Sequence, residues 1–356
     1  MKTPILLAMS GGVDSTVAAL LLRQQGYEIT AVNLKLQPDS PPDASLLQSC
    51  EMLNIPLIIR DCTEAFYNRV LLPGAREYAC GRTPNPCCLC NAVLKFKEIF
   101  AAADELGIPC VATGHYANLT QLSDGNTALI PAKDAAKDQS YFLYRLTQEQ
   151  LQRCVFPLGS YTKPEVRELA RQAGLVCAAR PDSQDACFQI PGECCGDTLS
   201  RLCKLCGKRG RFIYKGKTVG KHTGIHRYTI GQRQGLGVAL GVPAYVKSID
   251  PAKGDIELCT DQLELESCAF KITDTVWQQS FVPGRELTVK VRYRSGAVRC
   301  NVIPDSENCC QVELEKPLRA VTPGQSAVFY DSTGALVGGG VISSELKCPL
   351  ENSQPQ

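Results

Sequence analysis

The sequence predicts an α/β protein in which a doubly wound parallel sheet is followed by a small central domain and a C-terminal β-barrel. Residues 1 to about 190 alternate apolar strand signals with helix signals, as in an open sheet covered by helices on both faces. Residues 201–233 are strongly basic and interrupted by glycines. Residues 270–345 contain several short strands in which apolar and polar side chains alternate, the pattern of a small barrel.

These changes of character divide the 356 residues into an α/β domain (1–192), a basic central domain (193–270), a barrel (271–346) and a disordered tail (347–356). Hydrophobic residues make up 44% and charged residues 21%, as in globular proteins. No apolar run approaches the roughly 18 residues of a membrane span. The N-terminus lacks a signal-peptide pattern. We therefore expect a cytoplasmic protein with no membrane partner.

The first element is a buried strand, Ile5–Met9, followed by the loop Ser10-Gly11-Gly12-Val13-Asp14-Ser15 and a helix over 16–22. Two glycines permit a tight turn, and serine hydroxyls and free amides at a helix start can bind an anion. The loop lacks the Gly-Lys-Ser/Thr ending of a Walker A motif. It resembles the pyrophosphate-binding loop of enzymes that adenylate their substrates. The alternative is a plain strand-to-helix turn.

The remaining elements of this domain follow the same alternation. Strand signals recur at 29–34, 57–59 and 111–113, and a helical stretch covers 95–106. Another helix begins at Thr162, where a capping threonine, an early proline and an early acid follow one another. Ligands of such sheets bind at the carboxyl ends of the strands, which is where the Ser10–Ser15 loop falls.

Cysteine is unusually frequent, with 20 residues. Without a sign of secretion, we expect packing residues, metal or cluster ligands, or reactive thiols. Two prolines present Cys87 and Cys90 as a Cys-x-x-Cys pair shortly before a helix that starts near Val93. A helix N-terminus lowers a thiol pKa and favours thiolate. Cys187 follows in a polar loop.

Two features point to a polyanionic partner. Residues 201–233 contain ten Lys or Arg and no Asp or Glu, a local charge of 10 − 0 = +10. Such self-repulsion indicates contact with nucleic acid, and the alternative is a solvated face. In the barrel, Leu287, Val289, Val291 and Tyr293 alternate with Thr288, Lys290, Arg292 and Arg294, which predicts a strand with one apolar and one cationic face.

The motifs together identify the chain as similar to the tRNA-specific 2-thiouridylases of the MnmA type, which are PP-loop, adenine nucleotide alpha hydrolase-like proteins. The resemblance rests on SGGVDS, RTPNPxxxCN from Arg82, ATGHY from Ala112, KDQSYFLY from Lys137, DSxxxCF from Asp182, TIGQRxGLG from Thr229 and VTPGQSAVFY from Val321. It implies ATP-dependent replacement of O2 of the wobble uridine, uridine 34, by sulfur.

The resemblance also implies roles for individual residues. Cys90 is expected to attack and Cys187 to carry sulfur as a persulfide. The ATP site, with Mg²⁺, is expected to comprise Ala8, Met9, Ser10, Gly11, Gly12, Val13, Asp14, Ser15, Leu34 and Gly114. The target base and tRNA are expected to meet Asn85, Pro86, Cys87, Lys137, Asp138, Gln139, Arg292 and Tyr293. A sulfur-relay protein or cysteine desulfurase is the expected donor, and a disulfide bond is among the implied features.

Simpler interpretations remain beside these. His115 is interpreted as a structural histidine, Lys137 could be a surface charge, and Leu34 could be plain strand core. Some family members carry Asp where this chain has Cys87. Three thiols, Cys87, Cys90 and Cys187, could instead hold a [4Fe–4S] cluster whose fourth iron site binds sulfide.

A weaker metal hypothesis concerns zinc, for which Cys194, Cys195, Cys203 and Cys206 are the candidate ligands. The interpretation as packing residues of a helix stands against it. Two other functions stay open. One is an adenylating enzyme that acts on another tRNA position or a free nucleobase, and the other is a non-enzymatic zinc or cluster RNA-binding protein that kept the fold.

Overall fold

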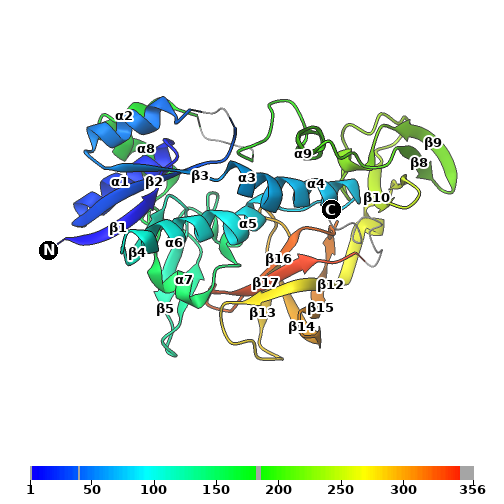
Figure 1. Cartoon of the computed structure of the whole chain (residues 1–356). Coiled ribbons are helices and arrows are strands. Elements are labelled where there is room, and N and C mark those ends of the chain that lie inside the picture. The colour runs from blue at the N-terminus through cyan, green and yellow to red at the C-terminus, as the bar shows by residue number, and fades with distance from the viewer. Residues whose placement is uncertain (1, 39–40, 182–185, 345–356) are drawn as a thin grey trace.

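The parallel sheet predicted for the first domain is present, with strand order β3-β2-β1-β4-β7 and only parallel neighbours. A computed structural model describes residues 2–38, 41–181 and 186–344 (Figure 1). The strands are β1 (Thr3–Ala8), β2 (Tyr27–Lys35), β3 (Leu57–Asp61), β4 (Cys110–Thr113) and β7 (Cys154–Val155). The strand order reverses between β1 and β4, so the loop after β1 lies at the topological switch point where such sheets bind ligands.

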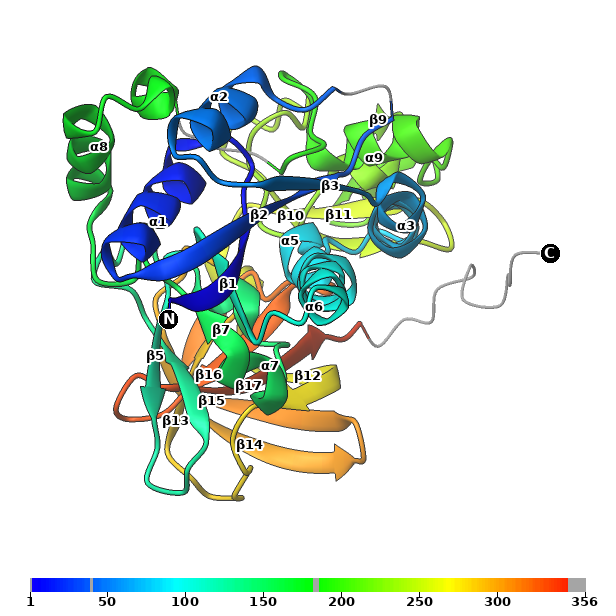
Figure 2. The ribbon, with the colours of Figure 1, turned by 60° about the vertical axis from the view of Figure 1, so that its left-hand side comes forward.

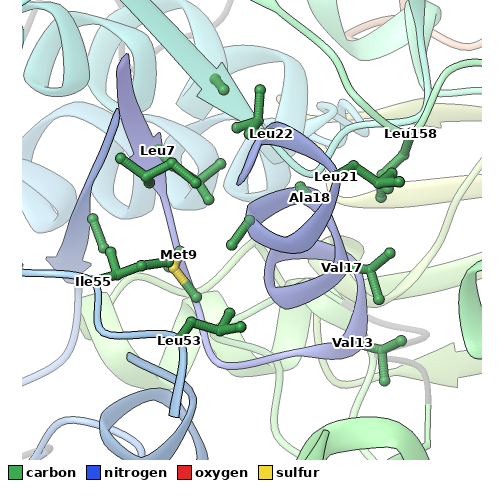
Figure 3. Packing of buried hydrophobic residues seen from close by; sticks show 14 of the residues in the cluster. Leu7, Met9, Val13, Val17, Ala18, Leu21, Leu22, Leu53, Ile55 and Leu158 are labelled. Carbon is green, nitrogen blue, oxygen red and sulfur yellow. The ribbon is translucent and has the colours of Figure 1, made fainter. Parts of the chain in front are cut away.

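Helices cover both faces of this sheet (Figure 2). In β1, Ile5 and Leu7 join a core with α1 (Val13–Gln24), α2 (Ala44–Met52) and α8 (Lys163–Gln172), whereas Leu6 joins a second core with α6 (Phe96–Glu105). Figure 3 shows Leu7 and Met9 on one side of α1, with Ile55 and Leu53 beside Met9. A strand buried on both faces explains why β1 is a continuous apolar run rather than an alternating one.

Two long helices of the first domain contain π-helical turns. One comprises α3 (Thr63–Phe66), the π turn η1 (Tyr67–Leu71) and α4 (Leu72–Ala79). The other comprises α5 (Pro86–Cys90), the π turn η2 (Asn91–Lys95) and α6. The second helix starts earlier than the sequence predicts, because the Asn85 side chain caps the N–H groups of Cys87 and Cys88, and Pro86 suits the first helical position.

The rest of this domain consists of short elements. They are the hairpin β5 (Asn118–Gln121) and β6 (Thr127–Ile130), α7 (Gln148–Arg153), and the 3₁₀ turns η3 (Ser140–Leu143) and η4 (Val176–Ala179). Among the described residues, none of the helices combines the length and apolar character needed to cross a bilayer.

The central domain is a four-stranded sheet of order β10-β11-β8-β9. Its elements are β8 (Gly210–Tyr214), β9 (Lys217–His222), η5 (Ile225–Arg227), β10 (Tyr245–Asp250), β11 (Asp255–Cys259) and η6 (Gln262–Leu265). The preceding helix α9 (Cys195–Cys203) packs instead on α4, with Leu199 in the same core as Tyr78. The predicted boundary at 192/193 thus assigns to the central domain a helix that packs on the first.

The last part of the chain is the predicted barrel, closed in the order β12-β15-β14-β13-β16-β17 with antiparallel neighbours. The strands are β12 (Glu266–Trp277), β13 (Leu287–Lys290), β14 (Val298–Ser306), β15 (Cys309–Arg319), β16 (Ser326–Tyr330) and β17 (Leu336–Ile342). The predicted boundary at 270/271 falls inside β12, which is one continuous strand from Glu266. The tail predicted to be disordered, 347–356, lies outside the described residues.

The strand predicted through Tyr293 ends at Lys290, which corrects one expectation. Arg292 and Ser295 close a turn instead: the Arg292 N–H donates to Ser295 Oγ (3.2 Å), and the Ser295 N–H donates to the Arg292 carbonyl (3.1 Å). Local alternation indicates a strand, but the turn's own hydrogen bonds replace the ladder here.

Candidate active site

A cavity of about 380 Å³ at the carboxyl end of the sheet, which we name the thiol cavity, brings most of the predicted site residues together. Its lining includes Ala8, Met9, Ser10, Asp14, Ser15, Leu34, Pro86, Cys87, Cys90, Gly114, Gln139 and Cys187. Gly11, Gly12, Val13, Asn85, Lys137, Asp138, Arg292 and Tyr293 are not part of this lining. Residues 182–185 of the Asp182–Phe188 motif lie outside the described part of the chain.

The loop after β1 is closed by its own serines. Ser15 Oγ accepts from the Ser10 N–H (3.2 Å) and donates to the Gly12 carbonyl (3.2 Å). Gly11 has φ +79°, and a Cβ there would lie 2.8 Å from the Leu46 backbone nitrogen. Because Gly12 is the N-cap residue of α1 and offers no side chain, the first N–H groups of α1 stay available to an anion.

Gly114, just after β4, passes very close to this loop. A Cβ at Gly114 would lie 2.9 Å from the Ser15 backbone nitrogen and 3.0 Å from the Asp14 carbonyl carbon. Any larger residue would displace the start of α1. The requirement for glycine here is therefore steric, and it comes from the loop on the neighbouring strand.

Asp14 is held by two groups that the sequence did not single out as functional. Lys163 Nζ lies 2.7 and 2.8 Å from the two carboxylate oxygens, and the Tyr116 hydroxyl donates to Oδ1 (2.8 Å). The Lys163 side chain is only 10% exposed. Thr162 and Glu165 form the predicted capping box at the start of α8, which places Lys163 over the loop.

The three thiols of the thiol cavity are free. Solvent reaches the side chains of Cys87 and Cys187, whereas Cys90 is buried. All three nevertheless lie deep among protein atoms, and this desolvation raises the pKa of Cys87 and of Cys90 and raises that of Cys187 to about 11. The helix N-terminus therefore does not produce ready thiolates in this state, because loss of water outweighs it.

Lys95 is the cation that opposes this effect. It lies in the π turn that follows Cys90, lines the thiol cavity, and lowers the pKa of Cys87, Cys90 and Cys187 by its charge. No ion pair to Lys95 occurs within the described ranges. A π turn inserts an extra residue into a helix and is frequent at functional sites. Sequence periodicity cannot reveal it.

His115 also lines the cavity but is built into its wall. Its Nδ1 lies 2.7 Å from Thr113 Oγ1, and its ring stacks on Phe96. Burial, with a smaller contribution from the Lys95 charge, lowers the pKa of His115 well below its usual range. The ring is therefore neutral at neutral pH, which favours the structural interpretation. Leu34 lines the cavity and also packs against the cores.

The residues expected to contact tRNA differ in their surroundings. Asp138 is buried and accepts from the Ala132 N–H (3.1 Å) and from both the N–H and the hydroxyl of Ser140 (3.1 and 2.9 Å). Gln139 exchanges hydrogen bonds with the Tyr116 backbone. We therefore expect Asp138 to position this segment rather than to touch RNA, whereas Lys137 is partly exposed.

Arg292 and Tyr293 likewise make contacts within the protein. Arg292 Nη2 donates to the Ile230 carbonyl (3.2 Å), the Ala320 carbonyl (2.7 Å) and Thr322 Oγ1 (2.6 Å). The Tyr293 ring packs on Phe142 at 4.5 Å between centroids. Arg292 thus joins the barrel to the glycine-rich loop of the central domain.

The segment that leads into α5 is held by all three domains. The Thr83 N–H donates to the Pro323 carbonyl (2.9 Å), and Gln325 Nε2 donates to the Thr83 carbonyl (2.7 Å). Thr83 Oγ1 lies 3.0 Å from Thr229 Oγ1 of the central domain. The orientation of the helix that carries Cys87 and Cys90 therefore depends on the barrel and on the central domain.

The metal hypotheses find no preformed site. In the described part of the chain, no group of three or more His, Cys, Asp or Glu side chains is arranged to hold a metal ion. Cys194 Sγ instead accepts from the Asp197 N–H as the cap of α9 (3.4 Å), and Cys206 Sγ contacts Ser200 Oγ (3.0 Å). Two of the four zinc candidates, Cys194 and Cys206, thus make local contacts to α9.

All ten cations of 201–233 are exposed, as the sequence predicts. Three of them form ion pairs with acidic residues: Arg201 with Glu193, Arg211 with Asp255 and Arg227 with Asp197. These acids lie outside the counted window, so the effective excess is smaller than +10.

Comparisons with known proteins agree with this architecture. Residues 3–191 match the tRNA methyl transferase HUP domain, 203–260 the tRNA methyl transferase PRC-barrel domain and 267–342 the aminomethyltransferase β-barrel domain. A solved 4-thiouridine synthetase–RNA complex with bound ATP aligns with 57% of this chain and 50% of that chain, at 18% identity and a TM-score of 0.37. A likeness this distant does not indicate an activity.

Curated relatives match nearly the full length. The tRNA-specific 2-thiouridylase MnmA 1 of Clostridium tetani is 39% identical over 97% of this chain and 98% of its own. The tRNA-specific 2-thiouridylase MnmA of Syntrophotalea carbinolica is 41% identical over 94% of this chain and 97% of its own. The chain therefore belongs to the family of tRNA-specific 2-thiouridylases.

Proposed function

We propose that this protein is an ATP-dependent tRNA-uridine 2-sulfurtransferase that acts on the wobble uridine, uridine 34. The observation that carries the proposal is the thiol cavity, in which an anion-binding loop and three thiols meet. An adenylating enzyme needs the loop, and a sulfurtransferase needs the thiols. Their convergence in one cavity allows both steps to occur on one bound base.

In the first step, O2 of the uridine attacks the α-phosphorus of ATP, and the bond to the β-phosphate breaks. The loop Ser10–Ser15 receives the departing pyrophosphate at the N-terminus of α1, as helix starts commonly bind phosphates. The base N3 proton leaves, so the product is a neutral O2-adenylated base. Lys163 holds Asp14 and supplies positive charge beside this site.

In the second step, the outer sulfur of a Cys187 persulfide attacks C2, and AMP leaves with the original oxygen. Cys90 thiolate then attacks the inner sulfur on Cys187, which frees 2-thiouridine and forms a Cys90–Cys187 disulfide. An external thiol reduces that disulfide. Desolvation raises the pKa of Cys90 and of Cys187. The positive charge of Lys95 therefore stabilises each thiolate as it forms.

Among the described residues, neither proposed inorganic cofactor has a preformed site. For Mg²⁺, the only carboxylate that lines the described part of the cavity is Asp14, which is already paired with Lys163. For a [4Fe–4S] cluster, the three thiols line one cavity but form no metal-holding group. We therefore propose the persulfide route and route no step through iron.

The tRNA partner is supported by exposed charge. Seven cations of 201–233 are exposed and form no ion pair with another described residue: Lys204, Lys208, Arg209, Lys215, Lys217, Lys221 and Arg233. Phosphate contacts by such residues supply sequence-independent affinity. The sulfur donor is proposed to be a persulfide carrier such as a sulfur-relay protein or a cysteine desulfurase, and the site of action is proposed to be the cytoplasm.

In vitro thiolation tests the proposal. Purified protein, ATP and unmodified tRNA are incubated with either sulfide or a persulfide-loaded cysteine desulfurase, and nucleosides and tRNA fragments are analysed by mass spectrometry. With the persulfide donor and a thiol reductant, we expect 2-thiouridine at position 34 with wild type and none with Cys90→Ser or Cys187→Ser, while Cys309→Ser on the barrel stays active. Sulfide alone should give no product by this route, because it cannot form a persulfide on Cys187 without an oxidant. Thiolation elsewhere in the tRNA, or thiolation that persists in the double variant, contradicts the proposal.

The cluster route has its own readout. Anaerobic reconstitution with iron and sulfide would give broad visible absorbance that Cys87→Ala abolishes. A colourless protein that thiolates tRNA excludes the cluster.

A further inference from the structure

Cys187 is shared between the thiol cavity and a second cavity of about 270 Å³, which we name the side cavity. The side cavity is lined by Asn33, Leu34, Lys35, Leu36, Gln37, Pro41, Pro42, Asp43, Ile59 and Cys187. None of its described lining residues belongs to the Ser10–Ser15 loop, and Cys87 and Cys90 do not line it. Of the three thiols, Cys187 alone can therefore be approached from this side.

The wall between the two cavities is the end of β2. Asn33, Leu34 and Leu36 line both cavities, as does Cys187. Gln37 Nε2 donates to the Cys187 carbonyl (3.2 Å) and ties the backbone of the cysteine to this wall. Cys187 is thus positioned at an opening between two spaces rather than at the bottom of one.

The chemistry of the side cavity fits a peptide better than RNA. Its charged lining residues are already paired: Lys35 with Asp61 (3.2 Å) and Asp43 with Arg180 (2.9 Å). Phosphate recognition needs cations that are free to neutralise it. The remaining lining is apolar or amide. Ile59, on the edge strand β3, is 45% exposed and places an apolar side chain at the rim of this cavity.

We propose that the side cavity receives the persulfide-bearing cysteine segment of the sulfur-donor protein, while the thiol cavity holds the nucleotide and the base. The inference rests on the proposed function and adds the surface by which sulfur enters. It explains how sulfur can reach Cys187 without passing Cys90, and without displacing ATP or tRNA.

The transfer step is balanced without any added oxidant or reductant. Cys187 thiolate attacks the outer sulfur of the donor persulfide, and a new sulfur–sulfur bond forms on Cys187. The donor's own sulfur–sulfur bond breaks, and the donor leaves as a thiolate. The hydrogen of the persulfide stays on the transferred sulfur.

Labelled sulfur tests the proposal in the absence of ATP and tRNA. The donor is a cysteine desulfurase loaded with ³⁵S from cysteine, and the comparison donor is a small-molecule persulfide. The probe variant is Ile59→Glu, and the matched control is Ile303→Glu on the barrel, where the isoleucine is 40% exposed. Label on Cys187 is measured over time, with Cys187→Ser as the blank.

We expect Ile59→Glu to slow labelling from the protein donor about tenfold and to leave labelling from the small persulfide within twofold of wild type. Ile303→Glu should change neither rate. Equal rates with the protein donor, or an equal loss with both donors, overturn the proposal, as does weaker tRNA binding by Ile59→Glu. If wild type accepts label as expected yet forms no 2-thiouridine, the proposed function fails and this inference survives.

Discussion

Replacing Lys163 with methionine tests the most consequential contact of the nucleotide site. The substitution keeps most of the side-chain volume and removes the ammonium group that lies 2.7 and 2.8 Å from the Asp14 carboxylate. Asp14 then keeps only its hydrogen bond from Tyr116 among the two contacts described. A carboxylate at the start of α1 is left without its counter-charge.

The expected magnitude follows from burial. Breaking a buried ion pair by removing one partner typically costs about 3–5 kcal/mol. Asp14 is 36% exposed and keeps a hydrogen bond, so water can compensate for part of the loss. We expect about 2–3 kcal/mol of lost stability, which corresponds to a fall in Tm of roughly 5–10 °C for a domain of this size. The KM for ATP should rise as the loop loosens.

The assay combines thermal unfolding with a double-mutant cycle. Lys163→Met, Asp14→Asn and the double variant should show a coupling energy of about 2 kcal/mol. The matched control is Lys133→Met, which breaks the exposed pair with Glu165 and should cost less than about 1 kcal/mol. Coupling below about 0.5 kcal/mol, or equal effects of the two lysine variants, would refute the reasoning.

Three further predictions follow from other contacts. Lys95→Met should raise the thiol pKa of Cys187 above its value of about 11 and slow its alkylation by iodoacetamide at pH 9 several-fold, whereas exposed Lys97→Met should not. Arg292→Met should lose one hydrogen bond to the central domain and two within the barrel, and should lower Tm by several degrees, with earlier cleavage in limited proteolysis; an unchanged proteolysis pattern would contradict it. Hydrogen bonds from Lys133 and from Thr162 hold the Glu165 pKa at about 2. The stability that ionised Glu165 contributes is therefore present above about pH 4.5 and is lost as the pH falls toward 2. Glu165→Gln should flatten that part of the curve when the free energy of unfolding is measured against pH.

Features that depend on neighbouring residues could be predicted from the local sequence pattern. The apolar run of β1, the two glycines and the serines correctly predicted a tight loop at the carboxyl end of the sheet, because Ser10, Gly12 and Ser15 close that loop by hydrogen bonds to one another. The barrel followed from alternation. The convergence of Cys87, Cys90 and Cys187 in one cavity, by contrast, came from the family resemblance, since almost a hundred residues separate Cys90 from Cys187.

What could not be predicted depends on partners far away in the chain. Lys163 and Asp14 are 149 positions apart, and a capping signature gave no sign of the pairing. The alternating pattern predicted a strand through Arg292, yet the strand ends at Lys290 and carbonyls 62 and 28 positions away engage the Arg292 side chain. The thiol pKa values shift upward because distant elements exclude water, which no helix-end argument could anticipate.

The contacts of Thr83 with the barrel and the central domain limit which fragments of this enzyme can remain functional. Three family domains match successive parts of the sequence, but the segment before α5 makes hydrogen bonds to the barrel and contacts Thr229, in a loop of the central domain. A fragment ending near residue 191 would keep every cysteine of the thiol cavity and still lose the scaffold that aims two of them. The three domains can therefore be recognised separately in the sequence, but all three are needed to orient the cysteines for catalysis. An engineered enzyme that carries out this sulfur transfer on another RNA would need the contacts of Thr83 as well as the cysteines.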